Sequence, residues 1–138
     1  MSKLIRFGVS LEDELLVPFD RLLKVKGYEN RSEAIRALIR EYLVKRQWVE
    51  GRETAGAITL VYDHHRRELV RKLTDIQHDF HHMIISTQHI HLDHDNCLEI
   101  IAVRGKPRDV EELSDRLKAV KGIKHGTLSL SSTGKEMV

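Results

Sequence analysis

The sequence predicts an α+β protein made of two small domains, and three observations support this. Apolar and polar residues alternate over positions 4–11, and two stretches with helical spacing follow them. A polar stretch with two glycines, residues 47–56, then breaks the helical pattern and is the expected linker. Beyond it, strand and helix patterns follow one another in the order βαββαβ. We expect a first domain over residues 1–48 and a second over residues 56–133.

The alternation at the start of the chain predicts a half-buried strand. One side of this strand would carry the apolar residues Ile5, Phe7, Val9 and Leu11. The other side would carry Leu4, Arg6, Gly8 and Ser10. Because side chains alternate across a strand, only the first set can face a core.

The first expected helix lies within "LEDELLVPFDRLLKVKG", where leucines and Phe19 recur at helical spacing. Asp13, after Ser10, could complete its N-terminal cap, and Gly27 is the expected stop. Pro18 would lie past the first turn if the helix starts near Asp13. A proline there lacks the N–H that the helix needs, so it should bend the helix or delay its start.

The second expected helix covers "RSEAIRALIREYLVKRQWVE" and presents one apolar face. Asn30 or Ser32 would cap its N-terminus, because both side chains can accept a hydrogen bond from a free backbone N–H.

One strand and two helices form too small a core for a monomer, and a lone strand has no hydrogen-bonding partner. Two copies solve both problems if their strands pair into an antiparallel ribbon with Arg6, Gly8 and Ser10 on its outer face. Such a ribbon fits the DNA major groove. This front region resembles the ribbon-helix-helix repressors, which implies a ribbon that reads bases and a second helix whose N-terminus holds phosphate. The alternative is a dimerisation module that binds no DNA.

The second domain is expected to form a four-stranded antiparallel sheet with both helices on one face, as the βαββαβ order implies. The expected strands are residues 57–64, 85–93, 97–105 and 123–131, and the expected helices are residues 66–84 and 108–122. The tripeptide "HDN" would form the turn between the second and third of these strands.

Composition narrows the cellular setting. No segment reaches the roughly 20 apolar residues of a membrane helix, and the start "MSKLIRFGVS" lacks the apolar stretch of a signal peptide. A single cysteine cannot form an internal disulfide, which suits a reducing compartment. We therefore expect a cytoplasmic protein with no membrane partner. The net charge of +2 says little about nucleic-acid binding, because it hides where the basic groups lie.

The stretch "TQHIHLDHDNCLEI" predicts a metal site. His89 and His91 lie two apart on a strand and would share a face, and Cys97 begins the neighbouring strand. Two imidazoles and a thiolate suit zinc, copper or nickel and leave one coordination position open. The candidates for that position lie on the preceding helix, which another subunit could supply, or in the turn. They are His78, His81, His82 and His94.

Other readings of these residues remain open. The pair His64 and His65 is expected to be a solvated strand end, and His125 is expected to be structural. A catalytic Cys97 with a histidine base is a further reading, but neither an oxyanion-donating glycine turn nor an acid stands beside it.

The whole chain resembles the nickel-responsive transcriptional regulators (NikR), through its front region, its βαββαβ rear, "IQHDFHH" and "HIHLDHDNCLEI". The resemblance implies an ACT-like, tetramerising rear domain. It implies nickel in a square-planar site across a subunit interface, held by His89, His91 and Cys97 of one chain and His78 of another. The base-facing positions would be Arg6, Gly8 and Ser10, where Gly8 departs from the hydrogen-bonding side chain often found there.

The expected function is therefore that of a nickel-dependent repressor, not an enzyme. It would act as a homotetramer, a dimer of dimers, on a palindromic operator in double-stranded DNA. By the general affinity order copper would bind such ligands more tightly than nickel, so selectivity must come from geometry and metal availability. Two alternatives are a metal storage or delivery protein and an ACT-domain regulator that senses a small ligand such as an amino acid.

Overall fold

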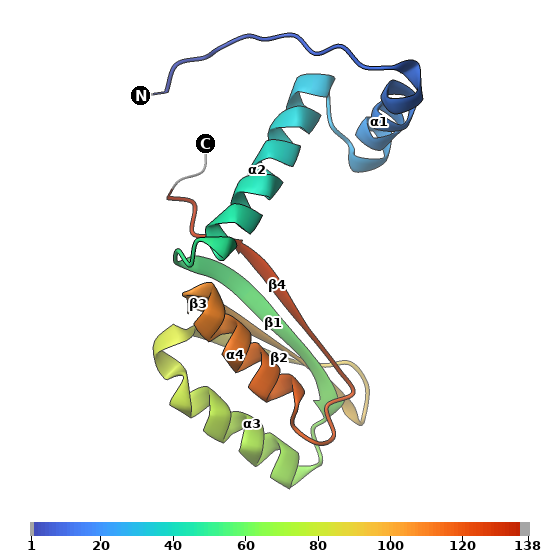
Figure 1. Cartoon of the computed structure of the whole chain (residues 1–138). Coiled ribbons are helices and arrows are strands. Elements are labelled where there is room, and N and C mark those ends of the chain that lie inside the picture. Colours follow the sequence, from blue (N-terminus) through green and yellow to red (C-terminus); the bar gives the residue numbers. More distant parts are fainter. Residues whose placement is uncertain (1, 136–138) are drawn as a thin grey trace. The chain divides into compact units, whose positions relative to one another are not determined.

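The computed structural model describes residues 2–135, apart from the side chain of Val49. The chain divides into two compact units, residues 1–41 and residues 42–138. Figure 1 shows the helices and strands of both.

The predicted N-terminal strand is not formed in the single chain. Residues 2–12 precede the first helix without helix or strand structure and run as an open stretch (Figure 1). The apolar side chains that were expected to be half-buried are exposed, Ile5 at 76% and Phe7 at 71%. A strand needs a second strand for its hydrogen bonds, and the first unit of one chain offers none.

Helix α1 spans Asp13–Lys26. The expected cap by Asp13 is wrong, because Glu12 is the N-cap residue and no side chain caps this end. Pro18 lies inside the helix without delaying its start. The expected stop is confirmed: Gly27 has a left-handed φ of 74°, a conformation that costs glycine little.

Helix α2 spans Arg31–Val49. Of the two candidate caps, Asn30 is the one used: its Oδ1 accepts a hydrogen bond from the N–H of Glu33 at 2.9 Å. The helix runs into the stretch expected to be a linker, so only residues 50–53 separate it from the first strand of the sheet.

The second unit has the predicted βαββαβ order. Its elements are β1 (Thr54–Asp63), α3 (Arg67–Asp79), a short 3-10 turn η1 (His81–Met83), β2 (Ile84–His91), β3 (Asn96–Gly105), α4 (Pro107–Lys118) and β4 (His125–Ser132). All neighbouring strands are antiparallel, in the order β2-β3-β1-β4. The expected helix over residues 66–84 ends earlier, at Asp79, which puts His78 in its last turn.

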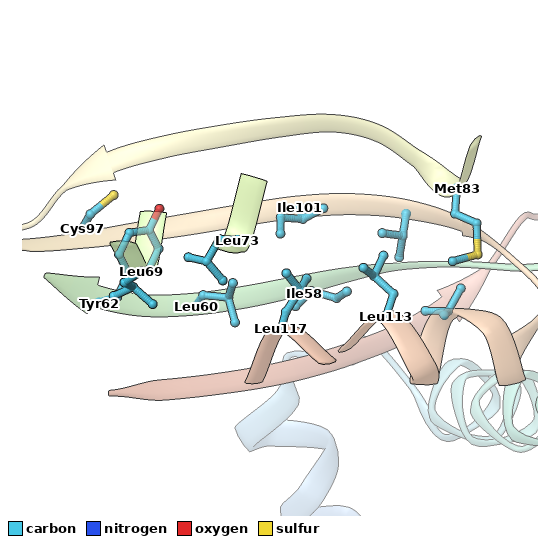
Figure 2. Packing of buried hydrophobic residues seen from close by; sticks show 12 residues of the cluster. Ile58, Leu60, Tyr62, Leu69, Leu73, Met83, Cys97, Ile101, Leu113 and Leu117 are labelled. Atoms are coloured by element: carbon cyan, nitrogen blue, oxygen red, sulfur yellow. The ribbon is translucent and has the colours of Figure 1, made fainter. Parts of the chain in front are cut away.

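The core of the second unit lies between the sheet and helices α3 and α4, which cover the same face of the sheet (Figure 1). Every second residue of β1 and β3 points inward, and leucines of α3 and α4 pack against them (Figure 2). The labelled residues in this layer include Ile58, Leu60, Tyr62, Leu69, Leu73, Ile101, Leu113 and Leu117. Cys97 lies at one end of the core, which places the start of β3 within the packed layer.

Candidate metal centre

The predicted ligands of the hairpin lie on one face of the sheet. In the β2–β3 register, His91 stands opposite Cys97 and His89 stands opposite Glu99. Residues directly opposite one another point to the same face, here the face that the helices cover. Cys97 is 1% exposed, and Figure 2 shows its sulfur beside Tyr62, whereas both imidazoles are exposed.

These side chains share a face, but one chain does not gather them into a closed ligand group. Among residues 2–135, the one group of three that brings its donor atoms within 4.8 Å of one another is His65, His94 and Asp95. His78 is exposed in the last turn of α3, and its ring lies 5.9 Å from the ring of His81. His81 in turn places Nδ1 2.9 Å from the carbonyl oxygen of His78.

A buried carboxylate beside His89 was not predicted. Glu99 is 1% exposed and accepts hydrogen bonds from the Tyr62 hydroxyl and, at 2.6 Å, from Nε2 of Gln77. Its carboxylate also lies 3.5 Å from Nε2 of His89. Because Gln77 precedes His78 on α3, Glu99 connects the hairpin to the helix that carries the fourth candidate ligand. The signal was available: Glu99 is a charged residue at an inward position of the otherwise apolar "CLEIIAV" strand.

Tyr62 keeps its proton in this environment. Burial, and then the hydrogen bond to Glu99, raise the pKa of Tyr62 well above its usual range. The hydroxyl therefore holds its proton and donates it in the hydrogen bond to Glu99.

Replacing Tyr62 with Phe should destabilise the second unit. The variant removes one donor from a buried carboxylate, which should lower the free energy of unfolding by ~1–3 kcal/mol. Urea unfolding of the metal-free protein measures this, with Tyr42→Phe as the control because Tyr42 is 62% exposed. Equal midpoints for Tyr62→Phe and Tyr42→Phe would contradict the role assigned to the buried hydrogen bond.

The turn between β2 and β3 is well ordered by its own side chains. The carboxylate of Asp93 accepts hydrogen bonds from the backbone N–H groups of Asp95 and Asn96 at 2.9 and 2.8 Å. The Asn96 side chain also donates to it, and these bonds lower the pKa of Asp93 to about 2. The position of Cys97 directly after this turn is thereby fixed.

His64 and His65 differ from the expectation of a solvated strand end. The Nε2 atoms of both rings lie 3.0 Å from the carbonyl oxygen of His94 in the turn. The ring of His64 also lies 4.6 Å, between centroids, from that of His91. Sequence reasoning missed this because the two segments lie about 30 residues apart. His125, expected to be structural, starts β4 with its side chain exposed.

The expected DNA-contacting residues lie in the open stretch before α1. Arg6, Gly8 and Ser10 are all exposed, and apart from Gly8 and its two chain neighbours no residue has a heavy atom within 4 Å of the place a Cβ would take at Gly8. The same stretch borders a groove of about 790 Å³ in the first unit. Apolar side chains line much of it, among them Ile5, Phe7, Val9, Leu16, Phe19 and Ile35. Across residues 2–135, none of the helices has the length and apolar character needed to cross a membrane.

Both regions of the chain match known protein families. Residues 5–46 match the model of ribbon-helix-helix proteins of the CopG family, and residues 55–131 match the NikR C-terminal nickel-binding domain. The chain is 61% identical to a nickel-responsive regulator of Syntrophus aciditrophicus, covering 98% of each chain. It is 60% identical to one of Chlorobaculum parvum, covering 96% of this chain and 98% of that one. It is 54% identical to one of Solibacter usitatus, covering 99% of each.

A solved structure supports the fold alone. An uncharacterized protein of Thermotoga maritima matches with a TM-score of 0.52 and 14% identity, covering 56% of this chain and 96% of that one.

The two domains together define a metal-responsive, DNA-binding transcription regulator, a class without enzymatic activity. The chain belongs to the NikR family of nickel-responsive regulators. The resemblance drawn from its motifs, the ribbon-helix-helix front and nickel as the metal are thereby confirmed.

Proposed function

We propose that this chain represses transcription by binding a palindromic operator when nickel(II) occupies an intersubunit His3Cys site. The ligands would be His89, His91 and Cys97 of one chain and His78 of another. The observation that carries the proposal is the register of the hairpin, which sets His91 directly opposite Cys97, with His89 on the same face.

The donor set fits nickel. A thiolate and imidazoles are ligands that nickel(II) accepts readily, and the Cys97 sulfur is shielded from solvent, which limits oxidation and competing reactions. Bound nickel would supply a positive charge that favours the thiolate form of Cys97. Glu99, close to Nε2 of His89, is placed to orient that ring by a hydrogen bond, as carboxylates commonly do for ligating histidines.

A second chain is needed to complete this site. His78 joins no ligand group within the described part of the chain, although its exposed position on α3 leaves it available to a neighbour. We infer that a hairpin from one subunit and an α3 helix from another meet at the metal.

Two uncovered apolar surfaces support a homotetramer built as a dimer of dimers. The first is the groove at the N-terminal stretch, where a second copy would pair its strand and bury side chains such as Phe7. The second is the sheet face that the helices leave uncovered, where Val61 and Ile90 both stand opposite Leu98. All three are only partly buried in the single chain. Each surface would form a different interface between chains. Two different pairwise interfaces together give an assembly of four chains.

Binding of DNA would depend on metal through linkage. Nickel can raise operator affinity only as far as it binds the DNA-competent arrangement better than the others, and DNA must tighten nickel by the same factor. A site shared between chains meets this condition, because filling it favours the assembled core over its separated parts.

A gel-shift assay with and without nickel tests the proposed function. Operator DNA should shift only with the nickel-loaded protein. A storage or delivery protein would bind nickel without a shift, and a sensor of another small ligand would shift DNA regardless of nickel.

Arg6→Ala is the matching test of the DNA surface. The variant removes one candidate contact from each strand of the ribbon, so operator binding should weaken by ~1–3 kcal/mol per lost specific contact while nickel binding is unchanged. Arg21→Ala is the control, because Arg21 is an exposed arginine on α1, outside the ribbon. Wild-type operator affinity in Arg6→Ala would refute the assignment of this strand face to DNA.

A further inference from the structure

An ion pair with two parallel hydrogen bonds joins the two helices of the first unit. Arg31 is the first residue of α2, and its Nε and Nη2 donate to Oδ1 and Oδ2 of Asp20 on α1, both at 2.9 Å. The hydrogen bond from Arg31, together with its charge, lowers the pKa of Asp20 below its usual range. The carboxylate is therefore ionised, and the pair is intact, at neutral pH.

The main consequence of this pair is a fixed orientation of the guanidinium group. Both side chains reach solvent, with 58% of the Arg31 side chain and 41% of the Asp20 side chain exposed. Most ion pairs at such exposed positions contribute little to folding. A contact that engages both carboxylate oxygens, however, allows only one orientation of the guanidinium plane. The Arg31 side chain is thus ordered before any ligand binds.

The ordered guanidinium lines the same groove as Arg6, the proposed base-reading residue. Arg6, Arg31 and Arg36 all border the groove of about 790 Å³. Of these, Arg36 is paired with Glu33 on its own helix at 2.7 Å. A ribbon that fills the major groove, roughly 12 Å wide, has a phosphate backbone along each side. A cation beside the ribbon therefore meets phosphate and not base edges.

Arg31 keeps hydrogen-bond donors for such a phosphate. A guanidinium carries five N–H donors, and Asp20 engages one on Nε and one on Nη2, so both donors of Nη1 and the second of Nη2 remain. We propose that Arg31 contacts a phosphate of the bound DNA and that Asp20 is a positioning residue, which orients the guanidinium for this contact. This inference rests on the DNA binding in the proposed function. Ordering the side chain in advance lowers the entropic cost of the contact.

The negative charge of Asp20 by itself acts against DNA binding. A carboxylate repels phosphate, so removing an acidic side chain near the DNA should tighten binding or leave it unchanged. Loss of a positioning contact should weaken binding instead. Because the two effects have opposite signs, the direction of the change in Asp20→Asn separates them.

Asp20→Asn should weaken DNA binding by the nickel-loaded protein, by ~2–10-fold for each Arg31 in contact, since a free side chain must then be ordered on binding. The loss should be equal for an operator duplex and for a random duplex of the same length, because phosphate contacts carry no sequence information. Glu29→Gln is the matched control. Glu29 is an exposed acidic residue that lines a second groove with Asp20 and Arg31, and its variant should bind both duplexes at least as tightly as the wild type.

The salt dependence of binding tests the phosphate contact itself. Arg31→Ala should reduce the slope of log affinity against log salt by ~0.9 for each Arg31 in contact. Arg21→Ala removes an exposed arginine elsewhere on α1 and should keep the wild-type slope. In an Arg31→Ala background, Asp20→Asn should no longer weaken binding, because Asp20 acts through Arg31.

Three results would each overturn the proposal. They are DNA binding by Asp20→Asn as tight as that of Glu29→Gln, an equal loss from Asp20→Asn with and without Arg31, and a wild-type salt slope in Arg31→Ala. Sedimentation of each variant ensures that slopes are compared at equal oligomeric state. Wild-type protein that binds DNA equally with and without nickel would contradict the proposed function, while the ratios between variants would still decide the role of Asp20.

Discussion

Cys97→Ala is expected to abolish the thiolate-to-nickel charge-transfer absorption and to weaken nickel binding by more than ~100-fold. Loss of a group that only supports a ligand typically costs 10–100-fold in metal affinity, and loss of the ligand itself should exceed this. The assignment is unusually direct because Cys97 is the single cysteine of the chain. Any thiolate band in the nickel-loaded protein must come from this sulfur.

The control has to separate a lost ligand from a damaged core, because Cys97 is buried among core residues. Urea unfolding of metal-free Cys97→Ala should show only a modest loss, ~1 kcal/mol for removal of one small buried group. Nickel titration then reports on the ligand alone. A variant that keeps the absorption band would show that Cys97 is not a ligand.

Phe7→Asp is expected to weaken operator binding by at least ~100-fold while leaving nickel-dependent absorption intact. In the proposed ribbon dimer Phe7 turns toward the helices, and a buried carboxylate without a partner costs several kcal/mol. Each 1.4 kcal/mol is a factor of ten in affinity. The ribbon dimer should dissociate, and the DNA-binding surface that it forms should be lost.

Val25→Asp is the matched control for this prediction. Both residues are exposed apolar side chains of the first unit, Phe7 at 71% and Val25 at 76%, but only Phe7 borders the apolar groove. Val25→Asp should therefore keep both the dimer and operator binding. If the two variants lose DNA binding equally, the groove is not the dimer interface.

The rear domain could be predicted closely because its pattern is local. Inward residues alternate along β1 and β3, and leucines recur at helical spacing along α4, so each element buries a face that the sequence displays. The errors in this prediction lie at the ends of the helices and strands. Helix α3, for example, ends at Asp79 before a 3-10 turn. Element ends depend on hydrogen bonds that periodicity does not encode.

The structure of the N-terminal stretch depends on a second chain. Its alternating pattern predicts a strand, but residues 2–12 stay open in one copy because the partner strand must come from a second copy. The start of α1 could not be predicted for a different reason. Glu12 is the N-cap residue but forms no side-chain cap, so the residue type at this position does not indicate where the helix begins.

The site was predictable only in part. The spacing of His89, His91 and Cys97 indicates a shared face, and the register agrees. By contrast, the contacts of His64 and His65 with the turn around His94 join segments far apart in the sequence, which spacing alone does not reveal. Glu99 lies between these cases, since a carboxylate at an inward strand position already indicates a buried polar partner.

A mixed-subunit experiment tests most directly whether nickel is shared between chains. Chains carrying only His78→Ala are mixed, under conditions shown to exchange subunits, with chains carrying only His89→Ala. An intact hairpin from the first can then meet an intact His78 from the second, so part of the nickel sites and of nickel-dependent operator binding should return.

The matched control is a mixture of His89→Ala chains with His91→Ala chains. Both substitutions fall in the set proposed to come from one chain, so every site stays broken and no nickel binding should return. A nickel site shared between chains should give recovery in the first mixture and none in the second. No recovery in the first mixture, despite demonstrated exchange, would mean that each site is built within one chain and that nickel does not bridge subunits.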